Sequence, residues 1–453
     1  MRATWYISIV TLALTTLLGD VSWAQPTPGF KTKIPDSVLT PDTVETRIGT
    51  LKFFDGIPEE KTAEALFHNL DLNRALQVYL NGMPASNFEA GRAGHIALGQ
   101  KTANQAIIFD GLMDSTSLFL TGNAGTVYLT MFLDLERDGP TVVEIPGGTG
   151  PGIMIDSCSR NVVDMGPPGP HHGQGGKFLI LPPGYKAEDF DDLVPQGVYT
   201  IAESRSYSVW VLLRGFLKDG KPDYSSDLFR KNIRIYPLST AANPPEMEFI
   251  PGTGKDFNTV HSANHKFYEE LHAVIEREPL EFLDPELRGL FASIGIQKGK
   301  PFTPDARMKE ILVQAAKLGN ATARAIFWYE RNQDEFLYEG SYWKRGMIGN
   351  SHEYLRDQGL GGRDIDARAQ YFYMATFNSP AMVWKLIGKG SQYAWGYRDS
   401  NGDYLDGGKH YTLNLPGNAP AEKLMSIVVY DSQTRSMLQN DQPYPNKKNN
   451  RDK

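Results

Sequence analysis

Cysteine is almost absent from this sequence: Cys158 is the single example among 453 residues. One thiol cannot form a disulfide within the chain, so we expect the folded protein to be held together by core packing. One cysteine also cannot build a structural zinc site of the thiolate type. We expect Cys158 to be a small buried hydrophobic residue rather than a catalytic nucleophile.

Long basic segments are also missing. Lys and Arg number 46 and Asp and Glu number 53, which gives a net charge of −7. A surface for nucleic acid or for an anionic membrane is therefore not expected. The sequence allows a small-molecule ligand and a homo-oligomer as partners.

The first residues have the features of an export signal. Arg2 provides a positive start, residues 6–18 form a short apolar stretch, and Ser22 and Ala24 are the small residues of a cleavage site. We therefore predict a signal peptide over residues 1–24, cleaved after Ala24, and a periplasmic or secreted protein. The alternative is an uncleaved anchor. The apolar stretch is too short to span a bilayer comfortably, so we expect no stable membrane span after cleavage.

Motifs of several enzyme classes are missing or defective. No Gly-x-Ser-x-Gly motif occurs, which argues against an α/β-hydrolase. The glycine-rich segment 166–178 looks like a phosphate-binding loop, but His171 stands where a P-loop needs Gly and Phe178 where it needs Ser or Thr. We therefore expect no nucleotide cofactor. Residues 399–403 imitate the start of a calcium loop, yet Tyr404 replaces its glycine, and a hairpin turn explains the segment better.

The histidines do not form a convincing metal site. His171 and His172 could be metal ligands or an acid–base pair, but adjacent residues in extended chain point to opposite faces. Either both are solvated or one lines the mouth of a cleft. His261, His265 and His272 have helical spacing but lack the glutamate of H-E-x-x-H, so we expect solvated or capping roles. We predict no metal and no other cofactor.

Blocks of strand and helix pattern alternate along the chain. Residues 25–60 have no sustained periodicity and are predicted as an extended arm. A helix follows, with Thr62 as its N-cap, and Gly82 and Pro84 are expected to end it. Short β-rich runs separated by turns fill residues 105–238, a pattern typical of an antiparallel sandwich or barrel.

Helical patterns return over residues 257–345, and strands from Tyr393 onward. Asp284-Pro285-Glu286 and Thr303-Pro304-Asp305 are both typical helix starts, with a cap, a proline and an acidic first turn. The predicted fold is α+β and mainly antiparallel β, with two β-sandwich or jelly-roll-like domains joined by helices. The predicted parts are a signal peptide (1–24), an extended N-terminal arm (25–60), an N-terminal β-rich domain (61–245), a helical connector (256–345) and a C-terminal β-rich domain (350–453).

Several strings of this sequence resemble a known two-domain family. Residues 75–84, 123–133, 166–185 and 207–215 resemble the domain of unknown function 1254. Residues 295–305, 390–393 and 429–439 resemble its usual partner, the domain of unknown function 1214. The resemblance implies an exported bacterial protein with two β-rich domains joined by helices. It implies no reaction and no catalytic residues.

Two departures from the family matter. Leu424-Met425-Ser426 stands where the family usually has Phe-Trp-Ser. The family also continues through further strands after residues 443–445, so we expect the C-terminal domain to be incomplete. The tail from Asn446 is polar, and its sequence assigns no structure to it and no replacement for the missing strands.

Two functions from different classes fit these observations. Aromatic residues make up 11% of the chain, and a cleft lined by some of them could hold an apolar ligand. The first hypothesis is a hydrolase-like enzyme acting on a small or amphiphilic substrate in such a cleft. The alternative is a non-catalytic periplasmic binding or envelope-interaction module. The candidate site residues are His171, His172, Tyr207, Arg214, Tyr430, Asp431 and Arg435.

Each candidate also has a purely structural explanation. Arg214 could be a paired charge at the end of a strand. Tyr430, Asp431 and Arg435 could form a turn that is held by its own hydrogen bonds. Ion-pair networks of this kind are commoner than active sites.

Overall fold

The computed structural model of the protein describes residues 33–190, 197–331, 335–384, 392–415 and 424–450. Helices and mostly antiparallel strands occur together in them, which confirms the predicted α+β class. The chain divides into two compact units, which meet in the sequence at Phe67 and His68. The predicted signal peptide lies outside the described residues.

The first unit contains a short helix and a small antiparallel sheet. Helix η1 (Asp36–Val38) precedes strands β1 (Thr43–Thr46), β2 (Gly49–Phe54) and β3 (Ile57–Pro58), which pair in that order. The described part of the predicted arm is therefore folded into strands. Thr62 is not an N-cap, because the next helix begins earlier, at Glu60; its hydroxyl instead accepts a hydrogen bond from the Lys52 amide (2.9 Å).

Helix α2 (Glu60–Leu98) continues through Gly82 and Pro84, so the predicted helix end at these residues is wrong. The Gly82 position is crowded, since a Cβ there would lie 2.8 Å from Leu271 Cδ2. The Pro84 carbonyl accepts a hydrogen bond from Ser159 Oγ (3.2 Å). A proline inside a helix costs about 3 kcal/mol, and tertiary packing of this kind is what offsets it.

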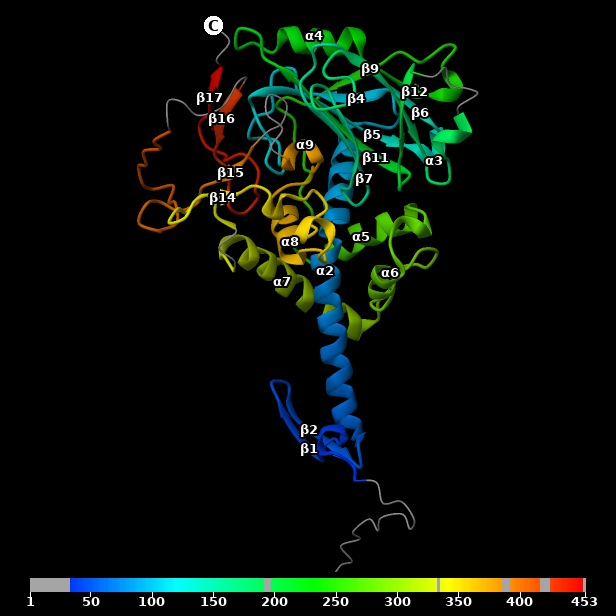
Figure 1. The fold of residues 1–453 in the computed structure, drawn as a ribbon, viewed down its shortest axis with the longest axis vertical. Coiled ribbons are helices and arrows are strands. Elements are labelled where there is room, and N and C mark those ends of the chain that lie inside the picture. Colours follow the sequence, from blue (N-terminus) through cyan, green and yellow to red (C-terminus); the bar gives the residue numbers. More distant parts are fainter. Residues whose placement is uncertain (1–32, 191–196, 332–334, 385–391, 416–423, 451–453) are drawn as a thin grey trace, which may run out of the picture. The chain divides into compact units, whose positions relative to one another are not determined.

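Two sheets form the β-rich part of the second unit (Figure 1). The six-stranded sheet has the order β13 (Glu248–Pro251), β4 (Gln105–Ile108), β5 (Thr126–Asp134), β11 (Ser208–Phe216), β7 (Gly152–Asp156) and β8 (Asn161–Met165). The four-stranded sheet has the order β10 (Tyr199–Glu203), β9 (Gly175–Leu181), β6 (Thr141–Pro146) and β12 (Arg234–Pro237). The β13–β4 and β10–β9 pairs are parallel, and the other pairs are antiparallel.

The two sheets share one hydrophobic core, and the strands read as nearly continuous apolar runs because their other faces are buried in further clusters. Leu129 and Val211 from the larger sheet pack in the same cluster as Val143 and Phe178 from the smaller one. Short helices lie between the strands in sequence: α3 (Leu135–Asp138), η2 (Ala187–Phe190), α4 (Asp223–Asn232) and η3 (Leu238–Thr240).

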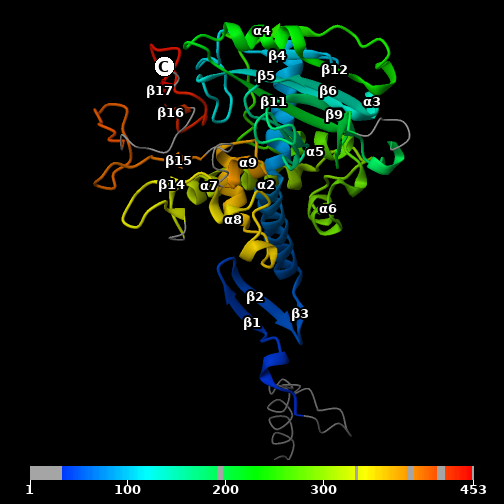
Figure 2. The ribbon, with the colours of Figure 1, turned by 45° about the horizontal axis from the view of Figure 1, so that its top comes forward.

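A layer of helices packs around the part of α2 that belongs to the second unit. In both views, α5 (Lys266–Arg277), α7 (Ala306–Trp328) and α8 (Ile365–Met374) lie close to α2 (Figure 2), and their buried residues form one core cluster. Helix η4 (Leu280–Phe282) leads to α6 (Pro285–Ala292). The predicted cap Asp284 is confirmed, since it accepts a hydrogen bond from the Leu287 amide (2.9 Å). The cap of α7 is Asp305, two residues after the predicted Thr303.

The C-terminal segment differs from the predicted second β-sandwich. Its described residues form η6 (Ile348–Asn350), η7 (Asp357–Gly359), α8 and α9 (Pro380–Val383), with short strands only. Strand β14 (Lys344–Arg345) pairs with β15 (Ala394–Trp395), and β16 (Leu424–Val428) pairs with β17 (Asn446–Asn450). The aromatic side chains of α8 are buried in the helical core, so this segment completes the second unit instead of forming a separate sandwich.

Two local expectations in this segment have clear outcomes. The predicted hairpin turn at residues 399–403 is confirmed, because the Asp399 amide donates to the Asp403 carbonyl (2.9 Å) and Arg398 bridges to Tyr404. The tail, to which the sequence assigned no structure, forms strand β17 over residues 446–450. Over the residues described here, the chain contains no helix with the length and apolar character needed to cross a membrane.

Candidate functional site

The two loop histidines are held in different surroundings. The His171 ring lies edge-on to Phe178 (5.0 Å between ring centroids), with Nε2 2.9 Å from Thr200 Oγ1. Gly176 allows this approach, since a Cβ there would lie 2.4 Å from the ring. His172 is exposed and has a positive φ of 48°. His171 therefore fastens the glycine-rich loop to β10, and the two rings do not converge.

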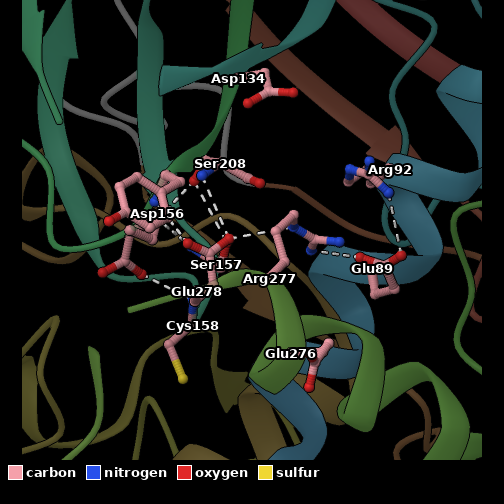
Figure 3. Close-up of polar contacts among 12 residues, drawn as sticks. Glu89, Arg92, Asp134, Asp156, Ser157, Cys158, Ser208, Glu276, Arg277 and Glu278 are labelled. Atoms are coloured by element: carbon pink, nitrogen blue, oxygen red, sulfur yellow. Dashed lines mark hydrogen bonds and ion pairs between the residues drawn. The ribbon is translucent and has the colours of Figure 1, made fainter. Parts of the chain in front are cut away.

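A buried network is centred on Glu278 (Figure 3), and the backbone of Tyr207 contributes to it. The Tyr207 amide donates to Glu278 Oε2 (2.6 Å), and Ser157 Oγ donates to Oε1 (2.6 Å). Arg277 Nε lies 3.3 Å from Glu278 Oε1, and the same guanidinium also pairs with Glu89 (2.6 Å). Because both oxygens of Glu278 already have donors, the network fixes the end of α5 against β7 and β11 and leaves no free acid or base.

Arg214 and Tyr430, both predicted candidates, lie in one neighbourhood. The Arg214 guanidinium is 5.8 Å from the Tyr128 ring centroid and also lies beside Tyr393 and Tyr430. Burial acts to lower the Arg214 pKa, but the phenols of Tyr128 and Tyr393 outweigh it and raise the pKa above its ordinary value. The Tyr430 hydroxyl donates to the Gly122 carbonyl (3.0 Å).

Asp431 and Arg435 form one turn. Asp431 Oδ1 accepts hydrogen bonds from the amides of Gln433 (2.9 Å) and Thr434 (2.8 Å), and the Arg435 amide donates to the Asp431 carbonyl (2.8 Å). The Asp431 carboxylate is thus used within the turn. Its effect is to set the direction of Arg435.

Arg435 is buried, with 4% of its surface exposed, and its backbone is in the left-handed region at φ 59°. Its Nε donates to the Tyr373 carbonyl (3.1 Å), and its guanidinium lies 4.6 Å from the centroid of the Tyr373 ring. No carboxylate in the described part of the chain forms an ion pair with it. A left-handed backbone at a bulky residue costs about 1 kcal/mol or more, and such residues concentrate at functional sites.

Arg435 belongs to a group of five polar side chains that we call the inner polar cluster. Its members are Tyr79 of α2, His261 before α5, Glu270 of α5, Tyr373 of α8 and Arg435. The Tyr79 and His261 rings are 6.3 Å apart between centroids. Arg435 acts on the pKa of both, which places its charge within short electrostatic range of them.

Three buried polar atoms of the inner polar cluster have no hydrogen-bond partner among the described residues: Tyr79 Oη, Tyr373 Oη and His261 Nε2. Leaving one buried polar group unpaired costs about 1–3 kcal/mol, so three in one place require an explanation. A bound ligand or a catalytic role is such an explanation.

The protonation state of His261 follows from its contacts. Nδ1 lies 3.0 Å from the Ser262 carbonyl oxygen, which can only accept, so Nδ1 carries the proton. Burial, assisted by the charge of Arg435, lowers the pKa of His261 to about 4. The imidazole is therefore neutral at pH 7, and Nε2 presents an unused lone pair.

Glu270 supplies a carboxyl group at the edge of the inner polar cluster. It accepts hydrogen bonds from the amide (3.0 Å) and the hydroxyl (2.6 Å) of Ser262, the residue that also binds His261. Burial raises the pKa of Glu270 to about 7. This carboxyl group can therefore gain or lose a proton near neutral pH. Glu270 is only partly buried, so the cluster reaches the surface on this side.

Packing of three helices fixes the Tyr79 ring. The ring stacks on Phe267 of α5 at 4.0 Å between centroids. Gly319 of α7 also lies against the ring, and a Cβ there would come within 2.5 Å of it. Only a glycine lets α7 approach this closely.

The inner polar cluster contains the groups needed for acid–base chemistry on an anion. They are a cation, an uncharged base, a carboxyl group whose pKa is near 7, and two phenol donors. No group of three or more His, Cys, Asp or Glu side chains that could hold a metal ion occurs in the described ranges. Burial raises the pKa of Cys158 to about 11, which makes its thiol a poor nucleophile.

The structure brings some predicted residues together and separates others. Arg435 lies in the inner polar cluster and Asp431 supports it, whereas His171, His172 and Tyr207 lie elsewhere. Sequence analysis missed Tyr79, Glu270 and Tyr373 and assigned His261 a solvated or capping role. A signal did exist, because Tyr79 and Arg435 both fall within the strings that carry the family resemblance.

Comparison with known families agrees with that resemblance. Residues 103–237 match the family described as "Protein of unknown function (DUF1254)", and residues 390–453 match "Protein of unknown function (DUF1214)". The predicted similarity to both is confirmed, and neither description names an activity. Tyr393 and Arg435 fall in the second matched region, whereas Tyr79, His261 and Glu270 lie outside both.

The chain was also compared with curated protein sequences and with solved structures. No curated protein sequence gives a significant match. Among solved structures, the crystal structure of the VPA0106 protein from Vibrio parahaemolyticus is similar, with 16% sequence identity and a TM-score of 0.48. The similarity covers 83% of this chain and 84% of that one.

Proposed function

For a chain that joins a DUF1254 region to a DUF1214 region, we propose the function of an exported, hydrolase-like enzyme. It acts on a small substrate with a negatively charged group, bound at the inner polar cluster. The observation that carries this proposal is the neutral His261 imidazole, whose unpaired Nε2 is buried in the neighbourhood of the Arg435 guanidinium. A buried imidazole nitrogen with a free lone pair, close to a positively charged guanidinium, is suited to take a proton from a reactant bound there.

Each member of the inner polar cluster has a role in this proposal. Arg435 holds the anionic group, and His261 Nε2 accepts the proton of the attacking water. Tyr79 and Tyr373 donate hydrogen bonds to the oxygen that becomes negative as the water adds. Glu270, with its pKa of about 7, returns a proton to the leaving group. Phe267 and the two phenol rings supply the aromatic wall.

The test is a hydrolysis screen of the purified protein with ester, amide and phosphoester substrates, combined with ligand-binding assays and metal analysis. His261→Gln keeps a polar side chain but cannot take a proton in this way, so it should lower turnover about a hundredfold or more. His272→Gln is the matched control, because His272 lies on the outer side of α5 and contacts the Lys300 carbonyl (2.9 Å). Equal activity of both variants would refute the role of His261.

A binding module is the second candidate, and an open groove favours it. The groove has a volume of about 450 Å³, and its lining combines amide and hydroxyl side chains with Leu118 and Phe257, with Asp256 as the one carboxylate. A lining without a paired base suits binding of a polar ligand better than catalysis. Saturable binding without turnover of any substrate, unaffected by His261→Gln, would favour this function. The lining residues are Ser115, Thr116, Leu118, Asp256, Phe257, Asn258, Gln439 and Asn440.

A further inference from the structure

A second feature, separate from the inner polar cluster, is a small cavity beside Arg214. It is partly open to solvent, and its inner space of about 20 Å³ has room for one water molecule or one monatomic ion. The glycine-rich loop, β7, β11, the start of α9 and Tyr393 contribute to its wall. The lining residues are Pro151, Gly152, Ile153, Asp164, Pro168, Leu212, Arg214, Ser379, Ala381, Met382 and Tyr393.

The charge of Arg214 is not balanced by its protein neighbours. No carboxylate in the described segments forms an ion pair with it; its neighbours are the phenols of Tyr128, Tyr393 and Tyr430. Arg214 is half-buried, and a guanidinium that has lost part of its hydration is stabilised by a counter-charge or by hydrogen-bond acceptors. Three neutral phenols supply no counter-charge.

Asp164 is the acidic residue of the cavity wall, but it serves a different contact. Its Oδ2 accepts a hydrogen bond from the Ala381 amide (3.2 Å), and the Ser379 side chain lies beside it. Burial raises its pKa, and Arg214 is not among the groups that act on it. Asp164 therefore fastens α9 to β8 and does not neutralise Arg214.

Tyr393 offers the cavity a donor that the protein does not use. Its Oη is buried and forms no hydrogen bond of ordinary geometry with the described residues, although it lies beside the Arg214 guanidinium. A hydroxyl group and a guanidinium that share one small cavity are typical donors for an anion.

We propose that the cavity binds a single small monovalent anion of the halide type, held by the Arg214 guanidinium and the Tyr393 hydroxyl. The inner space of about 20 Å³ matches one monatomic ion, whereas phosphate, sulfate or an organic acid would remain largely outside it. The bound anion neutralises Arg214 at the junction of the larger sheet with the C-terminal segment. It therefore contributes to stability independently of any turnover at the inner polar cluster.

The test uses the whole protein and chloride as the probe. Thermal unfolding is followed in sodium chloride and in sodium gluconate at equal ionic strength, because gluconate is too large to enter the inner space of the cavity. We expect chloride to raise the melting temperature in a saturable way, as a ligand of the folded state does, with bromide acting similarly. Equal melting temperatures in the two salts would overturn the proposal.

Two variants locate the effect. Arg214→Gln should abolish the difference between chloride and gluconate. Arg230→Gln, which alters an exposed arginine paired with Asp110 (2.6 Å), should leave it unchanged. If Arg214→Gln does not fold, Tyr393→Phe tests the same site while the charge remains, and we expect it to weaken chloride binding several-fold. A chloride effect that survives in Tyr393→Phe at full strength would contradict this assignment.

Discussion

Two buried histidines show how hydrogen-bond partners decide what an imidazole can do. His95 has contacts on both ring nitrogens, to the Gly91 carbonyl (2.7 Å) and to Thr130 Oγ1 (3.1 Å). Burial lowers its pKa to about 3, so it is a neutral, fully bonded core residue. His261 is also buried and neutral, but its Nε2 has no hydrogen-bond partner among the described residues. Only the second arrangement leaves an atom available for a substrate.

Glu270 gives a prediction of pH dependence at the same scale. The folded state raises its pKa from 4.5 to about 7, so between these values the folded protein holds a proton that the unfolded chain has released. The free energy of unfolding therefore falls as pH rises through this range. Glu270→Gln removes this pH dependence. Between pH 4.5 and 7, the free energy of unfolding of the variant should therefore rise relative to that of wild type by on the order of 2 kcal/mol.

Urea denaturation at several pH values measures this difference. Glu269→Gln is the control, because Glu269 is the exposed neighbour on the same helix. A pH profile of Glu270→Gln parallel to that of wild type would show that the carboxyl group is already ionised at pH 5.

At the scale of elements, local sequence rules worked where the chain is exposed and failed where it is buried. Asp284 caps α6 as predicted, because the cap is a contact within four residues. The predicted end of the helix at Gly82 and Pro84 was wrong, because these residues are held in α2 by contacts with α5 and with Ser159. Such contacts between distant segments are not part of any local sequence rule. The same limit applies to the site: Arg435 was found, but its neighbours come from distant segments.

Gly319 of α7 gives an element-scale prediction. Alanine is a better helix former than glycine by about 1 kcal/mol, but a Cβ at position 319 would lie 2.5 Å from the Tyr79 ring. Overpacking of a core costs about 1–3 kcal/mol, so Gly319→Ala should destabilise the protein. Gly289→Ala in α6, where nothing lies within 4 Å, should stabilise it by about 0.5–1 kcal/mol. Thermal denaturation compares the two, and stabilisation by both would mean that α7 can move away from Tyr79.

At the scale of the whole molecule, the C-terminal segment is bonded to a loop more than 300 residues earlier in sequence. The Thr121 amide donates to the Arg435 carbonyl (3.1 Å), and the Ser115 amide donates to the Pro443 carbonyl (3.0 Å). Thr121 also has a positive φ of 51°, which is unusual for a β-branched residue. The two segments therefore constrain each other, and neither could be placed from sequence alone.

Tyr430 tests this coupling. Tyr430→Phe removes the hydroxyl bonded to the Gly122 carbonyl (3.0 Å), so amide hydrogen exchange should quicken in residues 115–123 and 430–443 together. Tyr444→Phe removes a single exposed bond, to the Gly111 carbonyl (2.8 Å), and should have only a local effect. Faster exchange in the C-terminal segment alone would show that the segments open independently.

The place of Arg435 in the sequence has a consequence for biosynthesis. Tyr79, His261, Glu270 and Tyr373 all leave the ribosome before it, so a growing chain holds the other four members of the inner polar cluster without Arg435. The cluster is therefore complete only after residue 435 has been synthesised. A proteolytic cut ahead of residue 431 would separate Arg435 from the covalent chain that carries the other four side chains.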